Sequence, residues 1–312
     1  DILIESYRPG VMDRLGLGYE AIKAVNPGVI YCSISAYGQT GPYANRPGYD
    51  VIAQAVSGAM YMTGDPNGPP TKIGSAIGDW VGALAAFGTI GTAMYHRAVT
   101  GKGQHIDISL ARLLLWVFAR FDFTFTGKPE TRSGNYHTTL APYGIFNGSH
   151  GDSIIIGALN QNLWTKLCGV MGCPEFAEDP RYNTNAKRCD NLKDVIQIIE
   201  GWLKRLDDIG EAERRLMEAG VPCAKVYSPE DAFQDPHFNA CGWITKIPAP
   251  AGVTSIDGRF FPSNPFTFSA VAPQYRPAPT LGQDNHSILE RLGYSFEEVE
   301  NMQKEWSEKA KK

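Results

Sequence analysis

The sequence predicts an α/β fold whose larger part is built on a parallel sheet. Two short apolar runs, residues 1–7 and 29–35, enclose a stretch with helical spacing at 17–25. Two strands joined through a helix form the unit of a parallel sheet with a right-handed crossover. A second block of strand and helix patterns begins near residue 151, after a polar stretch. We therefore expect a parallel-sheet domain and a smaller α+β domain.

Turn signals set the limits of the elements in the first domain. The first strand ends at Pro9-Gly10, and the helix over 17–25 stops at Asn26-Pro27-Gly28. Residues 36–50 form a loop rich in glycine and proline, and residues 50–62 have helical spacing. The apolar run 80–95 is too short to cross a bilayer, so we expect a buried helix there. Residues 105–110 alternate as a half-buried strand does. Because the chain opens on a strand, we expect further residues before Asp1.

The second block predicts a strand over 152–159, an amphipathic stretch over 163–172 and a helix over 191–206. Proline-rich connections then lead to a helical tail over 287–312. The polar segment before this block, residues 126–150, is expected to be a linker.

Composition excludes several classes of protein. A net charge of -4 argues against nucleic-acid and anionic-membrane partners. The six cysteines have no paired CxxC spacing, so we expect free thiols and no metal. No secretory signal is visible, which favours a cytoplasmic location. The GxGxxG, GxxxxGK[ST], GxSxG and HExxH signatures are also absent.

Asp79 is a lone carboxylate in the segment "KIGSAIGDWVGAL", residues 72–84. One explanation is structural, because aspartate is a favoured helix N-cap and a helix is expected to start there. The other is functional, because the helix dipole favours the anion and a desolvated carboxylate can attack an acyl carbon. Neighbouring glycines would let a large ligand approach the backbone.

Arginine side chains follow the first strand, where sites of parallel sheets are built. Arg8 and Arg14 are either solvated or bind phosphate. Asp50 ends the glycine-rich loop and could equally cap the following helix. His105 and Asp107 alternate in a strand, and we interpret the pair as structural.

Five ordered segments resemble the class III CoA-transferases: "ESYRPGVMDRLGLGYE", "SISAYGQTGPYANRPGYDVIAQAVSG", "GDWVGAL", "TGKGQHIDISLAR" and "APTLGQDNHSILERLGYS". The resemblance covers essentially the whole chain. It implies a large Rossmann-like domain built from both ends of the chain, a small domain from the middle, and two interlocked protomers. Residues 1–125 would form the large domain without its N-terminal part, 126–150 the linker, 151–250 the small domain, and 251–312 the return to the large domain.

The resemblance also implies roles for particular residues. The family's nucleophile falls on Asp79, and Tyr49 would orient the thioester. The remaining implied positions bind coenzyme A or substrate: Ser6, Tyr7, Arg8 and Arg14 after the first strand, Pro47, Gly48 and Asp50 in the loop around the thioester, and Gly134, Asn135 and His137 in the linker. Formyl-CoA transferases carry a run of glycines in this linker, whereas this chain has "SGNYHTTLAPYG".

The implied activity is the transfer of coenzyme A from an acyl-CoA to a free carboxylic acid. It would pass through aspartyl anhydride and aspartyl-CoA thioester intermediates, without a metal, in an interlocked homodimer. Two alternatives stay open. The 2-methylacyl-CoA racemases of the same superfamily have "GHD" where this chain has "GYD", and tyrosine is a poor proton carrier near neutral pH. The other alternative is a non-catalytic CoA-binding subunit.

Overall fold

The computed structural model describes residues 1–118, 124–125, 127, 131–250 and 259–309. The chain forms two compact units, Asp1–Lys225 and Val226–Lys312. The expected domain boundaries at residues 126 and 251 coincide with positions outside the described residues.

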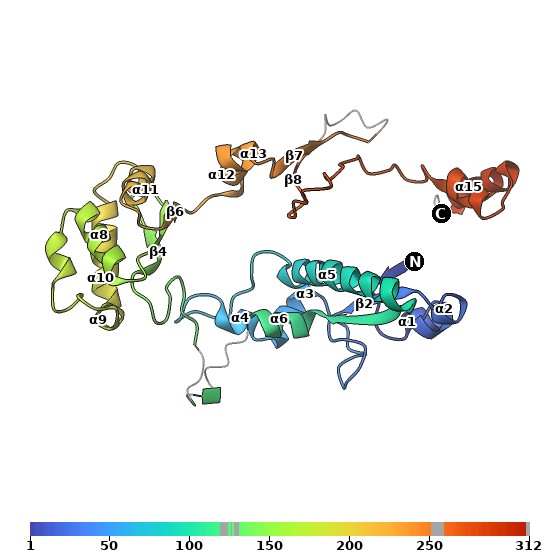
Figure 1. Ribbon diagram of the computed structural model, residues 1–312, viewed down its shortest axis with the longest axis horizontal. Helices are drawn as coiled ribbons and strands as arrows, with labels where there is room; N and C mark the ends of the chain where they lie inside the picture. Colours follow the sequence, from blue (N-terminus) through green and yellow to red (C-terminus); the bar gives the residue numbers. More distant parts are fainter. Residues whose placement is uncertain (119–123, 126, 128–130, 251–258, 310–312) are drawn as a thin grey trace. The chain divides into compact units, whose positions relative to one another are not determined.

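The first unit begins with the predicted parallel sheet (Figure 1). Its strands are β1 (Ile2–Glu5), β2 (Ile30–Ser35) and β3 (Gln104–Ser109), in the order β1-β2-β3 and parallel throughout. Two helices, α1 (Val11–Arg14) and α2 (Tyr19–Val25), lie in the connection between β1 and β2. The central strand pairs with a strand on each side, and its first four residues are buried. The strand–helix–strand prediction is confirmed.

Three helices lie between the glycine-rich loop and β3: α3 (Asp50–Val56), α4 (Ala59–Met62) and α5 (Ile77–Thr100). A fourth, α6 (Leu110–Phe118), follows β3. The single helix expected over 50–62 is divided, because Gly58 has a φ of +86° and ends the regular helical path. Helix α5 packs Ala86 against Cys32 and Ile108 of the sheet.

The expectation that α5 is buried is wrong. Its buried residues are all small: Gly78, Gly82, Ala86 and Ala93. Large apolar side chains on its other face stay exposed, Trp80 at 64% and Tyr95 at 73%. The glycines allow close packing, since a Cβ on Gly82 would lie 2.8 Å from Leu110 Cδ2. Hydropathy alone therefore identified the helix but not the side of it that faces the protein.

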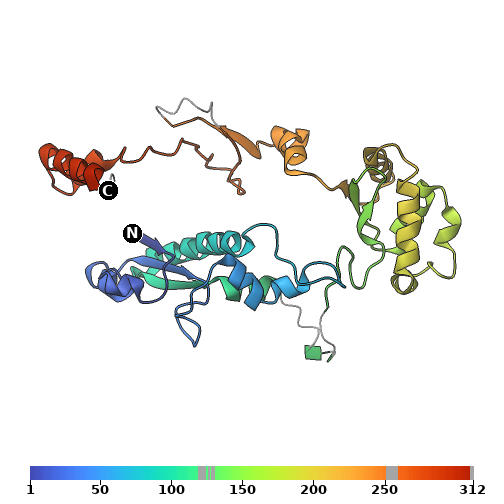
Figure 2. The ribbon, with the colours of Figure 1, turned by 180° about the vertical axis from the view of Figure 1, so that it is seen from behind.

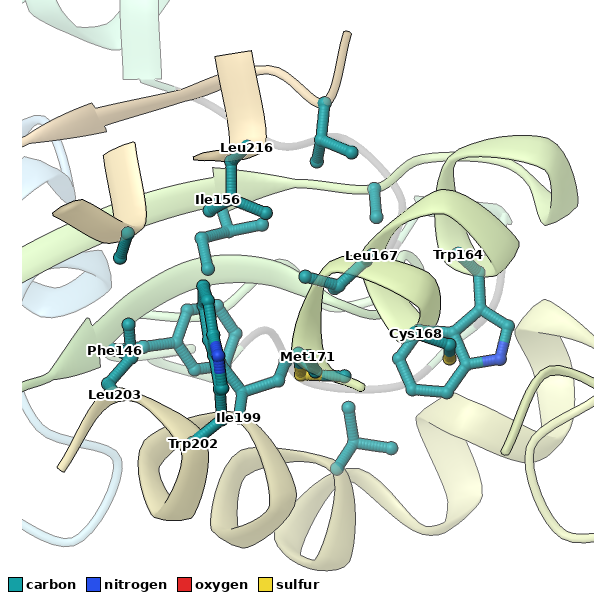
Figure 3. Packing of buried hydrophobic residues seen from close by; sticks show 14 of the residues in the cluster. Phe146, Ile156, Trp164, Leu167, Cys168, Met171, Ile199, Trp202, Leu203 and Leu216 are labelled. Carbon is teal, nitrogen blue, oxygen red and sulfur yellow. The ribbon is translucent and has the colours of Figure 1, made fainter. Parts of the chain in front are cut away.

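The rest of the first unit is an antiparallel sheet with helices. The strands are β4 (Tyr143–Asn147), β5 (Ser153–Gly157) and β6 (Cys223–Lys225), in the order β4-β5-β6. The helices are α8 (Gln161–Met171), η1 (Pro174–Ala177), α9 (Asn185–Asp190), α10 (Leu192–Leu203) and α11 (Ile209–Glu218). Figure 3 shows the core that these elements share, with Trp164, Phe146 and Trp202 among its buried side chains. Strand β4 lies within the segment expected to be a linker.

The second unit contains a two-stranded antiparallel sheet and short helices (Figure 2). Its elements are α12 (Pro229–Gln234), α13 (Pro236–Ala240), β7 (Ile244–Ile247), β8 (Arg259–Pro262), α14 (Asn285–Arg291) and α15 (Phe296–Lys309). The expected helical tail is broken at Gly293, which has a φ of +96°. His286 Nε2 lies 2.9 Å from Glu300 Oε1 and joins α14 to α15.

All six cysteines are free, as the sequence predicted. Within the described ranges, no helix combines the length and apolar character needed to span a membrane. The same ranges hold no group of three or more histidine, cysteine, aspartate or glutamate side chains placed to bind a metal ion.

Candidate active site

Asp79 lies in the first turn of α5 and not at its cap. The helix begins at Ile77, and its N-cap residue, Ala76, has no capping side chain. The structural explanation drawn from the sequence, in which Asp79 is the N-cap, is therefore wrong. The Asp79 side chain is exposed. Its carboxylate is consequently open to a ligand that reaches the start of the helix.

The side chain that caps α5 is that of Asp50, which lies 29 residues before Asp79 in the chain. The backbone N–H of Gly78 donates to Asp50 Oδ1 at 2.6 Å, and Gln54 Nε2 donates to Oδ2, also at 2.6 Å. Asp50 is the first residue of α3, whose N-cap is Tyr49, so the alternative in which Asp50 caps α3 is wrong. A Cβ on Gly78 would lie 2.8 Å from Asp50 Oδ1, so glycine is needed at that position for the contact.

Two carboxylates thus lie close together at the start of α5. Partial desolvation raises the pKa of Asp79, and the negative charge of Asp50 raises it further. The sequence predicted that the helix start would favour the anion, but these two effects outweigh it. A raised pKa makes the ionised carboxylate more basic and hence a better nucleophile. The expectation of a site with little water is not met by this chain alone, because Asp79 is exposed.

The glycine-rich loop ends at Tyr49 and Asp50, and it places Asp50 at the start of α5. A Cβ on Gly48 would lie 2.6 Å from Ala36 Cβ, so the end of the loop packs back on its beginning. Tyr49 is 81% exposed, whereas Asp50 turns toward α5. The predicted residue Pro47 is also exposed. The loop therefore presents an exposed aromatic ring one residue before the carboxylate that contacts the start of α5.

Ser6, Tyr7, Arg8 and Arg14 form an exposed segment after β1. The Tyr7 N–H donates to Glu5 Oε2 at 2.8 Å, and Gly10, with a φ of +79°, precedes α1. Among the described residues, neither arginine forms an ion pair. Because the three strands are parallel, this segment and the glycine-rich loop both leave the sheet at the edge formed by the carboxyl ends of its strands. Helix α5 runs back toward the start of β3, so its first turn, with Asp79, lies toward that edge too.

The linker residues are held by two anchors. At one end, Arg132 donates to the carbonyls of Tyr61 at 3.0 Å, Asp65 at 3.0 Å and Gly68 at 2.6 Å. Residues 61–68 belong to the end of α4 and the connection to α5, so Arg132 ties the linker to the segment between these helices. At the other end, Asn185 Nδ2 donates to the Thr139 carbonyl at 2.8 Å.

Between these anchors lie the three predicted substrate residues. Gly134 has a φ of +61°, and a Cβ there would lie 2.9 Å from Pro66 Cδ, so it packs on the anchored loop. Asn135 is exposed. His137 stacks on Tyr143 with ring centroids 5.3 Å apart. No hydrogen bond or ion pair joins these three residues to Asp79 in the part of the chain that the structure describes.

Comparison with known proteins identifies the family. The model of CoA-transferase family III matches residues 1–285. The chain belongs to CoA-transferase family III. The resemblance found in the sequence is confirmed, and so is the prediction of a class III CoA-transferase enzyme.

Two relatives of this chain are named as CoA-transferases. It is 36% identical over 293 residues to the acetyl-CoA:oxalate CoA-transferase of Acetobacter aceti, covering 92% of this chain and 72% of that protein. It is 34% identical to the succinate–glutarate CoA-transferase of Agrobacterium fabrum, covering 94% of this chain and 72% of that protein.

Solved structures agree on the fold. A CAIB/BAIF family protein from Brucella suis matches with a TM-score of 0.81 at 35% identity, over 94% of this chain and 75% of that one. A Mycobacterium tuberculosis protein matches with a TM-score of 0.79 at 23% identity, over 91% of this chain and 75% of that one, and this likeness shows the fold alone. The family III chain is thus a mixed α/β protein with a parallel sheet, as predicted.

Sequence reasoning missed two residues of this candidate site. Gln54 lies four positions after Asp50 on α3, a spacing that places both side chains on one helix face and could have predicted their contact. Arg132 gave no such signal, since it lies in a polar linker and its partners are backbone carbonyls 64 to 71 positions away.

Proposed function

We propose that this enzyme transfers coenzyme A from an acyl-CoA to a free carboxylic acid, with Asp79 as its nucleophile. The observation that carries the proposal is the position of Asp79, exposed in the first turn of α5 beside a second carboxylate that raises its pKa. The names of the relatives support the reaction class. Formation of a new acyl-CoA from a donor acyl-CoA and a labelled acid, without ATP, tests it directly.

The reaction proceeds in four exchanges. The ionised Asp79 attacks the donor thioester carbonyl, which gives an acyl–aspartyl anhydride and releases CoA thiolate. The thiolate attacks the aspartyl carbonyl, which gives an aspartyl-CoA thioester and frees the donor acid. The acceptor carboxylate attacks this thioester, which gives a second aspartyl anhydride and releases CoA thiolate. The thiolate then attacks the acceptor acyl carbonyl, which gives the new acyl-CoA and releases the Asp79 carboxylate. Backbone N–H groups near the start of α5 would stabilise each oxyanion.

Coenzyme A is bound by the exposed segment after β1 and by the end of the glycine-rich loop. Arg8 and Arg14 would hold its phosphates, with Ser6 and Tyr7 alongside. Their lack of ion pairs within the described chain and their position at the carboxyl edge of the sheet support this role. Pro47, Gly48, Tyr49 and Asp50 would lie around the thioester.

Arg14→Ala is expected to raise the KM for acyl-CoA about tenfold and to change kcat little, because a phosphate contact remote from the reaction gives mostly uniform binding. Steady-state kinetics with a varied acyl-CoA donor measure the split. Arg214→Ala, on the exposed surface of α11, is the matched control. An unchanged KM in the Arg14 variant would show that this arginine is merely solvated.

We propose a dicarboxylic acid as the acceptor. Two relatives are named for oxalate and for succinate and glutarate, which are all dicarboxylic acids. The linker residues Gly134, Asn135 and His137, held beside residues 61–68, would contact the acid. A panel of mono- and dicarboxylic acids, each assayed with acetyl-CoA and succinyl-CoA, identifies the acceptor, and a preference for monocarboxylic acids would contradict this choice.

Tyr49→Phe is expected to leave partial transferase activity, because the ring still packs beside the thioester without carrying a proton. A racemase would need a proton carrier at this position, and phenylalanine would abolish its turnover. Incubation of wild-type enzyme with a 2-methylacyl-CoA in deuterated water separates the two activities. Deuterium at the α-carbon would favour the racemase over the transferase.

We also propose that two copies of the chain form the interlocked homodimer implied by the resemblance, with the segment from 251 onward returning to the large domain, and that this homodimer is cytoplasmic. Large exposed apolar side chains along α5 support a covering partner: Trp80, Leu84, Tyr95 and Val99. Light scattering coupled to size-exclusion chromatography measures the mass of the assembly. A monomer at micromolar concentration would contradict the dimer.

A further inference from the structure

Gln54 is a fully buried polar side chain in the contact between α3 and its neighbouring helices. Its exposed fraction is 0%, and the adjacent buried residues Ala53, Leu110 and Leu114 are apolar. A buried amide costs free energy unless its donors and acceptor find partners. The partners of Gln54 therefore indicate why a polar residue is kept at this position.

The NH₂ group and the oxygen of the Gln54 side-chain amide both form hydrogen bonds. Its Nε2 donates to Asp50 Oδ2 at 2.6 Å and to the Ser75 carbonyl at 3.3 Å. Its Oε1 accepts from the Ile73 N–H at 3.1 Å. One side chain thus fixes two points of the loop before α5 and one oxygen of Asp50.

The other oxygen of Asp50 connects this arrangement to the nucleophile. Asp50 Oδ1 accepts from the N–H of Gly78, the residue directly before Asp79. Hydrogen bonds therefore run from Gln54 through Asp50 to the first turn of α5. In this arrangement the Asp50 side chain cannot rotate without losing a hydrogen bond from Gly78 or Gln54. Loop residues 73–75 cannot move without losing their hydrogen bonds to Gln54.

We propose that Gln54 is a positioning residue for the nucleophile: its amide sets the orientation of Asp50 and of loop residues 73–75, and thereby the orientation in which the first turn of α5 presents Asp79. The inference rests on the proposed function, since it assigns Asp79 as the attacking group. Gln54 does not touch the substrate, so its loss should slow the chemical step more than it weakens binding of acyl-CoA.

The amide, and not merely the size of the side chain, is required. A glutamate here would place a second carboxylate against Asp50 and against the Ser75 carbonyl, with no N–H to donate. A proton shared between the two carboxylates would restore one donor, so the defect should be relieved in acid. The other charged groups at this point are Asp79 on α5 and the Lys72 ammonium, which donates to the carbonyls of Ile73 and Gly74. Helix α6 contributes apolar side chains.

The experiment compares Gln54→Glu, Gln54→Met and wild type, with Gln197→Glu on the exposed face of α10 as the matched charge control. Steady-state kcat and the KM for acyl-CoA are measured across pH, per folded enzyme, with folding followed by circular dichroism and thermal unfolding. We expect both Gln54 variants to lose about 100-fold in kcat near neutral pH, because small misplacements of reacting groups have effects of that size. The KM should stay within about threefold of wild type.

The pH dependence distinguishes positioning from packing. In the Gln54→Glu variant, kcat should recover about tenfold or more as the pH falls and the shared proton binds, relative to wild type at the same pH. In Gln54→Met, which has no group to protonate, no such recovery is expected. Wild-type kcat in a folded Gln54→Met variant would overturn the proposal, and so would the same pH profile in both variants. Failure of both variants to fold would overturn it too, since Gln54 would then determine folding instead of positioning.

The wild-type enzyme separates this inference from the proposed function. Trapping of the acyl-enzyme with hydroxylamine should mark Asp79. If wild type carries the mark and the Gln54 variants keep wild-type kcat, only the role of Gln54 is wrong. If wild type carries no mark at Asp79, the proposed function itself is wrong.

Discussion

Asp79→Asn is expected to lower kcat by about three orders of magnitude or more, with the fold intact. An amide cannot form the anhydride, and removal of a covalent nucleophile typically has effects of this size or larger. Asp79 is exposed and its carboxylate does not cap α5, so its replacement should leave the thermal stability nearly unchanged. The measurement is the initial rate of acyl-CoA formation at saturating donor and acceptor.

Asp207→Asn is the matched control, since it makes the same chemical change at another exposed position. The control should keep wild-type turnover. If the Asp79→Asn enzyme also turns over within tenfold of wild type, Asp79 is only part of the helix start and another group performs the attack.

Asp50→Asn is expected to lower kcat about 10- to 100-fold, because the two hydrogen bonds that orient residue 50 against the first turn of α5 cannot both be kept. The asparagine oxygen can still accept from Gly78, but its NH₂ group then faces the NH₂ of Gln54, which now donates to Oδ2. One of these contacts must be lost. The Asp50 charge, which helps raise the pKa of Asp79, is lost as well.

The loss of this charge predicts a shift in the pH profile with a definite sign. Asp79 attacks in its ionised form, so activity falls as the pH drops through its pKa. Removing the charge of Asp50 lowers that pKa, and the acid limb of the kcat profile should therefore move to lower pH than in wild type. An acid limb that stays in place, with Asp207→Asn as control, would contradict electrostatic coupling between the two carboxylates.

The fold was predictable where the sequence pattern is local. The apolar runs 1–7 and 29–35 and the helical spacing between them correspond to β1, β2 and α2. The exposed face of α5 was not predictable from hydropathy, because Trp80 and Tyr95 are apolar yet unburied in this chain. Small residues such as Gly82 form its contacts, and their burial depends on how closely Leu110 approaches.

The candidate site was predictable only in part, for a similar reason. For both Asp79 and Asp50, the sequence offered a helix cap as one of two explanations, because each lies at the start of a helical run. The structure joins them through a hydrogen bond between residues 28 positions apart, which no local pattern encodes. Gln54 could have been recognised from its helical spacing to Asp50. Arg132 contacts backbone carbonyls far away in the sequence, and no local sequence pattern predicts such contacts.

The measurement that tests the central claim most directly is chemical trapping of the acyl-enzyme. The enzyme is incubated with donor acyl-CoA and then with hydroxylamine, which converts an aspartyl anhydride or aspartyl thioester to a hydroxamate. Peptide mass spectrometry should place the hydroxamate on Asp79, only when acyl-CoA was present, and not in the Asp79→Asn variant. A hydroxamate on a different acid, or full turnover with no modified peptide at all, would contradict the assignment of Asp79 as the nucleophile.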